Sequence, residues 1–239
     1  MRHAFFVMLV ALPTAVFADF EMRYDDGTVG LVADGRVMFG DDQDRFLIEA
    51  GKEEMLLIDD REKTVMRVKP GFMKDMMAQA RAEMEQMLAG MPPEQRAMVE
   101  AQMGNMLPPM PEDLPALEIV RTGNEHEVAG YDCDEVEVRT EAGAVEEVLC
   151  VADADELGID DDDFETLTAA MRQMMEMASV GASNVPQADF GELGGVPIRT
   201  SGSGNPSALV SIDTGAIDAA RMQVPAGYRE VTMEEMMRR

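Results

Sequence analysis

The 239-residue chain has no tryptophan, two cysteines and two histidines, and only 5% of its residues are aromatic. His3 lies in a leader-like segment, so a processed chain would keep only His126. A zinc site of two or three imidazoles is therefore excluded, and we expect His126 to be a solvated hairpin residue. The chain also has no Gly-x-Ser-x-Gly elbow, phosphate-binding loop or dinucleotide fingerprint. We therefore expect a protein that is not an enzyme and holds no cofactor.

Basic residues are scarce. Lys and Arg number 20 against 47 Asp and Glu, which gives a formal net charge of −27 at pH 7. Such a chain is repelled by the phosphates of nucleic acids and by anionic membrane surfaces. The composition therefore excludes nucleic acid as a partner.

No apolar run is long enough to span a bilayer comfortably, so we expect no membrane-spanning segment. Arg2, the apolar residues 4–16 and the sequence Val16-Phe17-Ala18 together form the pattern of a signal peptide over residues 1–18, cleaved after Ala18. Position 19 is Asp rather than Cys, so the pattern does not predict lipid attachment there. We expect a periplasmic or secreted protein whose mature part, residues 19–239, is a single domain.

Short apolar runs separated by turn residues predict an antiparallel sheet. Asp34-Gly35 is one such turn, and Asp-Gly between apolar runs is a strong hairpin signal. The predicted strands cover residues 20–24, 29–32, 36–39, 45–49, 55–58, 64–68, 117–121, 132–140, 144–151, 196–200 and 208–213, with a weaker candidate at 216–222. A helix is predicted at 164–178, where Asp162 and Glu165 fit a capping box. We expect an α+β fold with a strongly curved sheet covered on one face.

Residues 70–110 interrupt the strand pattern and contain ten methionines. Apolar residues recur there at spacings of three and four, which places them on one stripe of a helix. Pro92 and Pro93 cannot continue the first helix but suit the first turn of a second. The segment therefore predicts a helical hairpin that covers the sheet, with an apolar ligand-facing side formed by Met73, Met77, Met84, Met87, Met91, Met103 and Met106.

Three interpretations of these methionines remain open. Thioether side chains fill irregular cores, and they also form adaptable apolar binding surfaces for lipids. Pairs of methionines three residues apart could instead bind Cu(I) through two sulfur atoms. Such pairs are Met73/Met76, Met84/Met87, Met103/Met106 and Met174/Met177.

Cys133 and Cys150 are the only cysteines, and an exported chain permits a disulfide between them. If residues 140–143 form a turn, Cys133 lies directly opposite Cys150, although Glu137 then faces Glu146 at a cost in repulsion. A structural disulfide is favoured over a redox pair because no Cys-x-x-Cys unit is present. The acidic run at 153–163 does not fit a calcium-binding EF-hand loop, and we interpret it as solvated acids before a helix.

Several stretches resemble a family of exported bacterial proteins, mostly of unassigned function, whose architecture is similar to the periplasmic lipoprotein carriers LolA and LolB. The matching stretches are residues 19–24, 58–67, 128–133, 146–159 and 224–228. The resemblance implies a half-open antiparallel barrel whose concave face is capped by helices and can hold acyl chains. It implies no lipoprotein-transfer activity.

The sequence and the resemblance together predict a non-catalytic exported binding protein. Its expected partner is a lipid, an acyl chain or a lipidated protein in the concave face of the sheet. The alternatives are a methionine-rich periplasmic protein that binds Cu(I) or another soft metal, and a purely structural or interaction domain.

Overall fold

The computed structural model describes residues 19–69, 71, 78, 82, 86–88, 92, 117–178, 190–202, 206–232 and 235. Helices α3 (Asp161–Ala178) and α4 (Phe190–Leu193) lie in these residues. The strands are β1 Phe20–Tyr24, β2 Val29–Ala33, β3 Arg36–Gly40, β4 Asp44–Glu49, β5 Met55–Asp59, β6 Thr64–Val68, β7 Leu117–Val128, β8 Tyr131–Thr140, β9 Val145–Ala152, β10 Val196–Gly202, β11 Ser207–Thr214 and β12 Arg229–Glu230.

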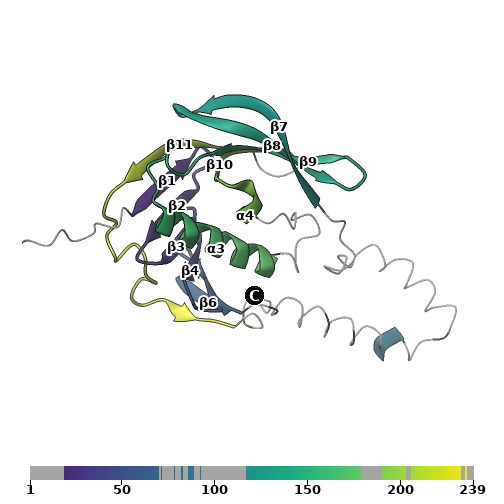
Figure 1. The fold of residues 1–239 in the computed structure, drawn as a ribbon. Coiled ribbons are helices and arrows are strands. Elements are labelled where there is room, and N and C mark those ends of the chain that lie inside the picture. The colour runs from purple at the N-terminus through teal and green to yellow at the C-terminus, as the bar shows by residue number, and fades with distance from the viewer. Residues whose placement is uncertain are drawn as a thin grey trace, which may run out of the picture.

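In the described part of the chain these strands form one 12-stranded sheet in the order β12-β6-β5-β4-β3-β2-β1-β11-β10-β9-β8-β7. Every neighbouring pair is antiparallel except β12 and β6. The sheet is strongly curved and does not close, and α3 and α4 lie on its concave side (Figure 1). The expectation of a curved antiparallel sheet is confirmed, but the described fold is mostly β rather than evenly α+β.

Most of the strands predicted from the sequence lie within one or two residues of their observed bounds. The Asp34-Gly35 turn has φ angles of 50° and 68°, which suit the tight hairpin turn that this dipeptide predicts. The strand expected at 216–222 is wrong, because no strand forms in this segment and residues 219–222 are in turns. The sequence did not predict α4 or β12, because both are too short to carry a periodic signal.

The sheet has a buried layer on both faces, where the sequence predicted only one. One layer packs under α3 and includes Phe20, Met22, Val32, Leu167 and Ala170. The other covers the opposite face of β2–β6, where the C-terminal turns pack Ile217, Met222, Val224 and Tyr228 against Leu31, Met38, Leu47 and Ile58. Strands buried on both faces lose the simple alternation of apolar and polar residues, which explains the apolar run in β2.

The β8–β9 hairpin corrects the predicted register. The turn at 140–143 forms as expected, with Thr140 bonded to Ala144, and a bulge then shifts the strands by a further residue. Cys150 therefore pairs with Glu135 instead of Cys133, and Glu137 faces Val148 rather than Glu146. The predicted disulfide is nevertheless present, with 5.4 Å between the Cα atoms of Cys133 and Cys150. A register error of two residues leaves both cysteines on the same face, so they stay within bonding reach.

The start of α3 differs from the predicted capping box. Asp160 caps the helix, since its Oδ1 accepts the backbone N–H of Asp163 at 2.9 Å. The helix therefore begins at Asp161, three residues before the predicted start. Three successive aspartates fill its first turn, where the helix dipole favours negative charge. That preference does not distinguish one aspartate from the next, so the sequence could not fix the capping residue.

The predicted signal peptide and most of the predicted methionine hairpin lie outside the described residues, and no methionine-rich hairpin is evident in the described part. The few described residues of that segment include the neighbours Met87 and Leu88. Met87 is 62% exposed, whereas Leu88 is 7% exposed.

Candidate functional site

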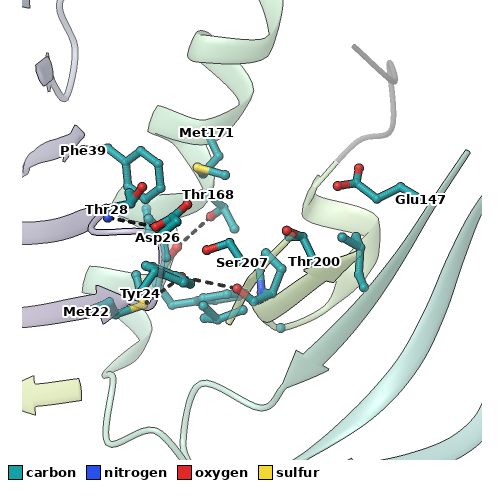
Figure 2. Close-up of a pocket in the computed structure, with 16 residues that line it drawn as sticks. Met22, Tyr24, Asp26, Thr28, Phe39, Glu147, Thr168, Met171, Thr200 and Ser207 are labelled. Atoms are coloured by element: carbon teal, nitrogen blue, oxygen red, sulfur yellow. Dashed lines mark hydrogen bonds between the residues drawn. The ribbon is translucent and has the colours of Figure 1, made fainter. Parts of the chain in front are cut away.

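The main candidate site is a partly open cavity of about 260 Å³ between α3 and the concave face of the sheet, which we call the α3 cavity (Figure 2). Strands β1, β3, β9, β10 and β11 contribute to its walls together with α3. The lining residues are Met22, Tyr24, Asp26, Thr28, Phe39, Glu147, Leu149, Phe164, Leu167, Thr168, Met171, Gly195, Val196, Pro197, Thr200 and Ser207.

Helical spacing explains the contribution of α3. Phe164, Leu167 and Met171 lie three and four residues apart, so they share one stripe of the helix, and all three line the cavity. Across from them, Met22 and Tyr24 of β1 are two residues apart and therefore point to the same face of the sheet. The apolar walls are thus formed by one face of a helix, with a spacing of three and four residues, and one face of a strand, with a spacing of two.

Gly195 allows β10 to approach β9 closely at the edge of the cavity. A Cβ atom at this position would lie 2.5 Å from the carbonyl oxygen of Ala152 and 2.8 Å from a side-chain carbon of Val151. The first contact is with backbone, which cannot move aside like the end of a flexible side chain. Only glycine fits, and its place beside Val196 and Pro197 sets the shape of this wall.

Tyr24 is one of three aromatic residues in the cavity lining, with Phe39 and Phe164. Its ring packs edge-on against Phe39, with 6.3 Å between ring centroids, and its hydroxyl donates to the carbonyl of Pro197 at 3.4 Å. Burial, reinforced by the nearby Asp26 carboxylate, raises the pKa of Tyr24. The phenol is therefore neutral throughout the physiological range and serves as a hydrogen-bond donor.

The two carboxylates of the lining differ in their surroundings. Burial favours a higher pKa for Asp26, but hydrogen bonds from Thr28 and Ser207 outweigh it and leave that pKa below the usual range. The backbone N–H of Thr28 donates to Asp26 Oδ1 at 2.8 Å. Burial raises the pKa of Glu147, and this side chain has no hydrogen-bond or ion-pair partner within the described residues. Asp26 is thus a satisfied structural acid, whereas Glu147 remains available.

The methionines predicted to face a ligand are not the ones that line the α3 cavity. Met73, Met77, Met84, Met91, Met103 and Met106 lie outside the described residues, and Met87 is exposed. Met22 and Met171 line the cavity instead. The sequence did carry a signal for part of the site, because the apolar stripe of α3 is visible in it. The β1 contribution depends on how distant strands pair, which the sequence did not reveal.

The family of this protein follows from residues 46–228, which match a family described as a domain of unknown function, DUF4412. The chain belongs to the DUF4412 family. No curated protein matches the chain. Two solved structures of PNGF-II, in the C2 and P21 space groups, are similar to it at 8% identity, with TM-scores of 0.29 and 0.30. Each match covers 92% of this chain and 32% of PNGF-II, so the chain spans about a third of that protein's length. The likeness to PNGF-II is too distant to bear on function.

These comparisons refine the resemblance drawn from the sequence. Membership of a family of unassigned function is confirmed, whereas a LolA-like or LolB-like fold is not shown by the matched structures. The disulfide of this DUF4412 protein is consistent with an oxidising compartment outside the cytoplasm. Among the described residues, no helix is long and apolar enough to cross a membrane.

His126 lies in a polar network on β7 and β8 of the DUF4412 fold. It is partly exposed, and its Nε2 lies 2.9 Å from Glu135 Oε2. Hydrogen bonds from Asn124, His126 and Thr122 lower the pKa of Glu135 to about 2. The prediction of a solvated hairpin histidine omitted this network, which a bulged β7–β8 pairing brings together.

A second pocket, of about 280 Å³, is polar and acidic. It is lined by Glu125, Asp132, Cys133, Asp134, Val151, Asp153 and Glu156. Within the described ranges, no three His, Cys, Asp or Glu side chains are grouped so that they could hold a metal ion. The acids of this pocket are therefore too dispersed to form a metal centre, and the α3 cavity is the stronger candidate site.

Proposed function

We propose that this DUF4412 protein is a non-catalytic exported binding protein that holds one acyl chain, from a lipid or a lipidated partner, in the α3 cavity. The observation that supports this function most directly is the cavity itself, a partly open apolar space under the only long helix of the described residues. Ligand sites in proteins are typically concave and mainly apolar, with a few polar groups that fix orientation. Leu149, Leu167 and Met171 supply the apolar walls, and the hydroxyl of Tyr24 is one of the polar groups.

The size of the cavity favours a slender ligand. Pockets for drug-sized molecules span about 300–1,000 Å³, and the α3 cavity, at about 260 Å³, lies just below that range. A single alkyl chain fits such a space, whereas a diacyl lipid would leave one chain outside. Each buried methylene contributes about 0.8 kcal/mol, so even a partly sheltered chain binds measurably.

The architecture supports the same proposal. A curved open sheet with helices on its concave side resembles the arrangement by which LolA and LolB are expected to hold acyl chains (Figure 1). We extend the resemblance only to the binding of an apolar chain. The methionines of residues 70–110 are proposed to extend this apolar surface.

Co-purification and a neutral dye test the proposal. Native mass spectrometry of gently purified mature protein should reveal a bound lipid, and Nile red should bind with enhanced fluorescence. Met171→Gln places an amide in the wall of the cavity and should weaken Nile red binding about tenfold, which corresponds to about 1.4 kcal/mol. Ala169→Gln is the matched control, since Ala169 is an exposed residue of α3 outside the cavity lining. A cooperatively folded protein with no bound lipid and no Nile red binding would refute the proposal.

A further inference from the structure

The charges of the α3 cavity have one sign. Its lining includes the carboxylates of Asp26 and Glu147 and no Lys, Arg or His among the described residues. The whole chain carries a formal net charge of −27, so the surrounding potential is also negative. An anionic head group, such as the carboxylate of a free fatty acid, would meet repulsion at this site and no compensating cation.

Glu147 is the carboxylate of the cavity lining that is free to bind a ligand, because it has no partner among the described residues. It lies on β9 between Val138 of β8 and Gly202 of β10. In Figure 2 it stands on the opposite side of the cavity from Tyr24 and Asp26. A half-buried carboxylate without a hydrogen-bond donor loses hydration that nothing in the described structure restores. A positively charged group on a ligand would compensate for this lost hydration.

Building on the proposed function, we infer that the occupant of the α3 cavity is a cationic amphiphile, an alkyl chain with an ammonium head group that pairs with the Glu147 carboxylate. The chain lies along Leu149, Leu167 and Met171, and the head group reaches Glu147 at the edge of the cavity. Asp26 is not the partner, because Thr28 and Ser207 already occupy it. Ion pairing favours the charged carboxylate, so ligand binding lowers the pKa of Glu147 that burial raises.

Three ligands of equal chain length test the head group. Dodecylamine, dodecan-1-ol and dodecanoate are added to mature protein loaded with Nile red, at pH 7.5, below their micellar concentrations and in 0.15 M and 0.5 M salt. A partly buried ion pair of about 1.4 kcal/mol gives a tenfold preference. Dodecylamine should therefore displace the dye at about one tenth of the concentration of dodecan-1-ol, and dodecanoate should be the weakest.

Glu147→Gln keeps the shape of the side chain and removes its charge. The variant should bind Nile red as the wild type does, which shows that the cavity is intact, but its affinity for dodecylamine should fall to that for dodecan-1-ol. Glu141→Gln, at the exposed tip of the same hairpin, changes the net charge equally and should leave the preference for the amine unchanged.

The outcomes separate the head-group inference from the proposed function. Equal displacement by all three ligands, or a preference for the alcohol or the carboxylate, overturns the inference but leaves an acyl-binding cavity in place. An amine preference that survives in Glu147→Gln also overturns it, since attraction to the general surface charge would then be the cause. If Nile red does not bind and no ligand is retained, the proposed function itself fails.

Discussion

Replacing Asp163 with Asn should stabilise the protein at neutral and alkaline pH. Asp163 is 5% exposed, and its Oδ2 atom is buried without a hydrogen-bond partner. Burial, followed by the nearby carboxylates of Asp160, Asp19 and Asp162, raises the pKa of Asp163 from 3.8 to about 6. A buried charge with three acidic neighbours destabilises the folded state, and asparagine removes that charge at nearly constant shape.

The difference between the folded and unfolded pKa of Asp163 sets the size of the expected stabilisation and the pH range in which it appears. The folded protein holds the Asp163 proton up to about pH 6, whereas the unfolded chain releases it near pH 3.8, so unfolding releases a proton between these values. The stability of the wild type therefore falls as pH rises through this window and stays lower above it. A shift of about two pH units corresponds to about 3 kcal/mol. Removing an acid from the first helical turn costs about 0.3–1 kcal/mol through the helix dipole, which leaves a net gain of about 2 kcal/mol.

Urea unfolding of the wild type and Asp163→Asn, followed by circular dichroism at pH 3.5, 5, 6 and 8 and constant ionic strength, measures the difference. The free energy of unfolding of the variant should exceed that of the wild type by about 2 kcal/mol at pH 8 and lose this advantage by pH 3.5. Asp161→Asn is the matched control, because Asp161 is an exposed aspartate of the same helical turn and is not among the carboxylates that raise the pKa of Asp163. An Asp163→Asn protein that is less stable at pH 8, or whose advantage does not depend on pH, would refute the reasoning.

Three further predictions concern the helix cap, the disulfide and the methionines. Asp160→Ala removes the acceptor for the N–H of Asp163 and should lower the free energy of unfolding by about 1 kcal/mol in urea titrations; an unchanged midpoint would contradict the assigned cap. Protein recovered from the periplasm should gain two mass units on reduction, and Cys133→Ser should lose about 3 kcal/mol of stability; free thiols in the recovered protein would show that the disulfide does not form there. Replacing Met84 and Met87 with Leu should leave Nile red binding intact, because leucine keeps the apolar character; loss of tight, stoichiometric Cu(I) binding in an anaerobic titration would instead favour the soft-metal alternative.

The α3 cavity illustrates how far sequence periodicity reaches. The sequence predicted the helix at 164–178, and helical spacing within it places Phe164, Leu167 and Met171 on one stripe, because helical neighbours in space are close in the chain. The opposite wall comes from β1, which pairs with β11 near the other end of the chain. No local pattern specifies that pairing, so the site could not be assembled from the sequence.

The covering of the second face of the sheet, opposite α3, could not be predicted from the sequence either. Residues 216–222 were predicted as a weak strand, and nothing in the sequence of residues 215–228 indicated that this stretch covers β2–β6. They are held there by contacts between distant residues. Arg221 donates to Glu21 at 2.6 Å, and the hydroxyl of Tyr228 donates to Asp60 at 2.5 Å. Arg45 also bonds Asp60 through two nitrogen atoms.

The sequence by itself determined the existence and type of the main strands, the helix α3, the hairpin turns and the cysteines that pair. These features depend on neighbours within a few residues, through strand alternation, helical spacing and the left-handed turn at Asp34-Gly35. Tertiary structure alone decided the strand order, the bulge that shifts β9 against β8, the second buried face and the isolated Glu147 carboxylate. These features depend on which distant segments bury their apolar surfaces against one another. The free energy of that burial depends on the area buried and not on how far apart the segments lie in the sequence, so local patterns do not specify it.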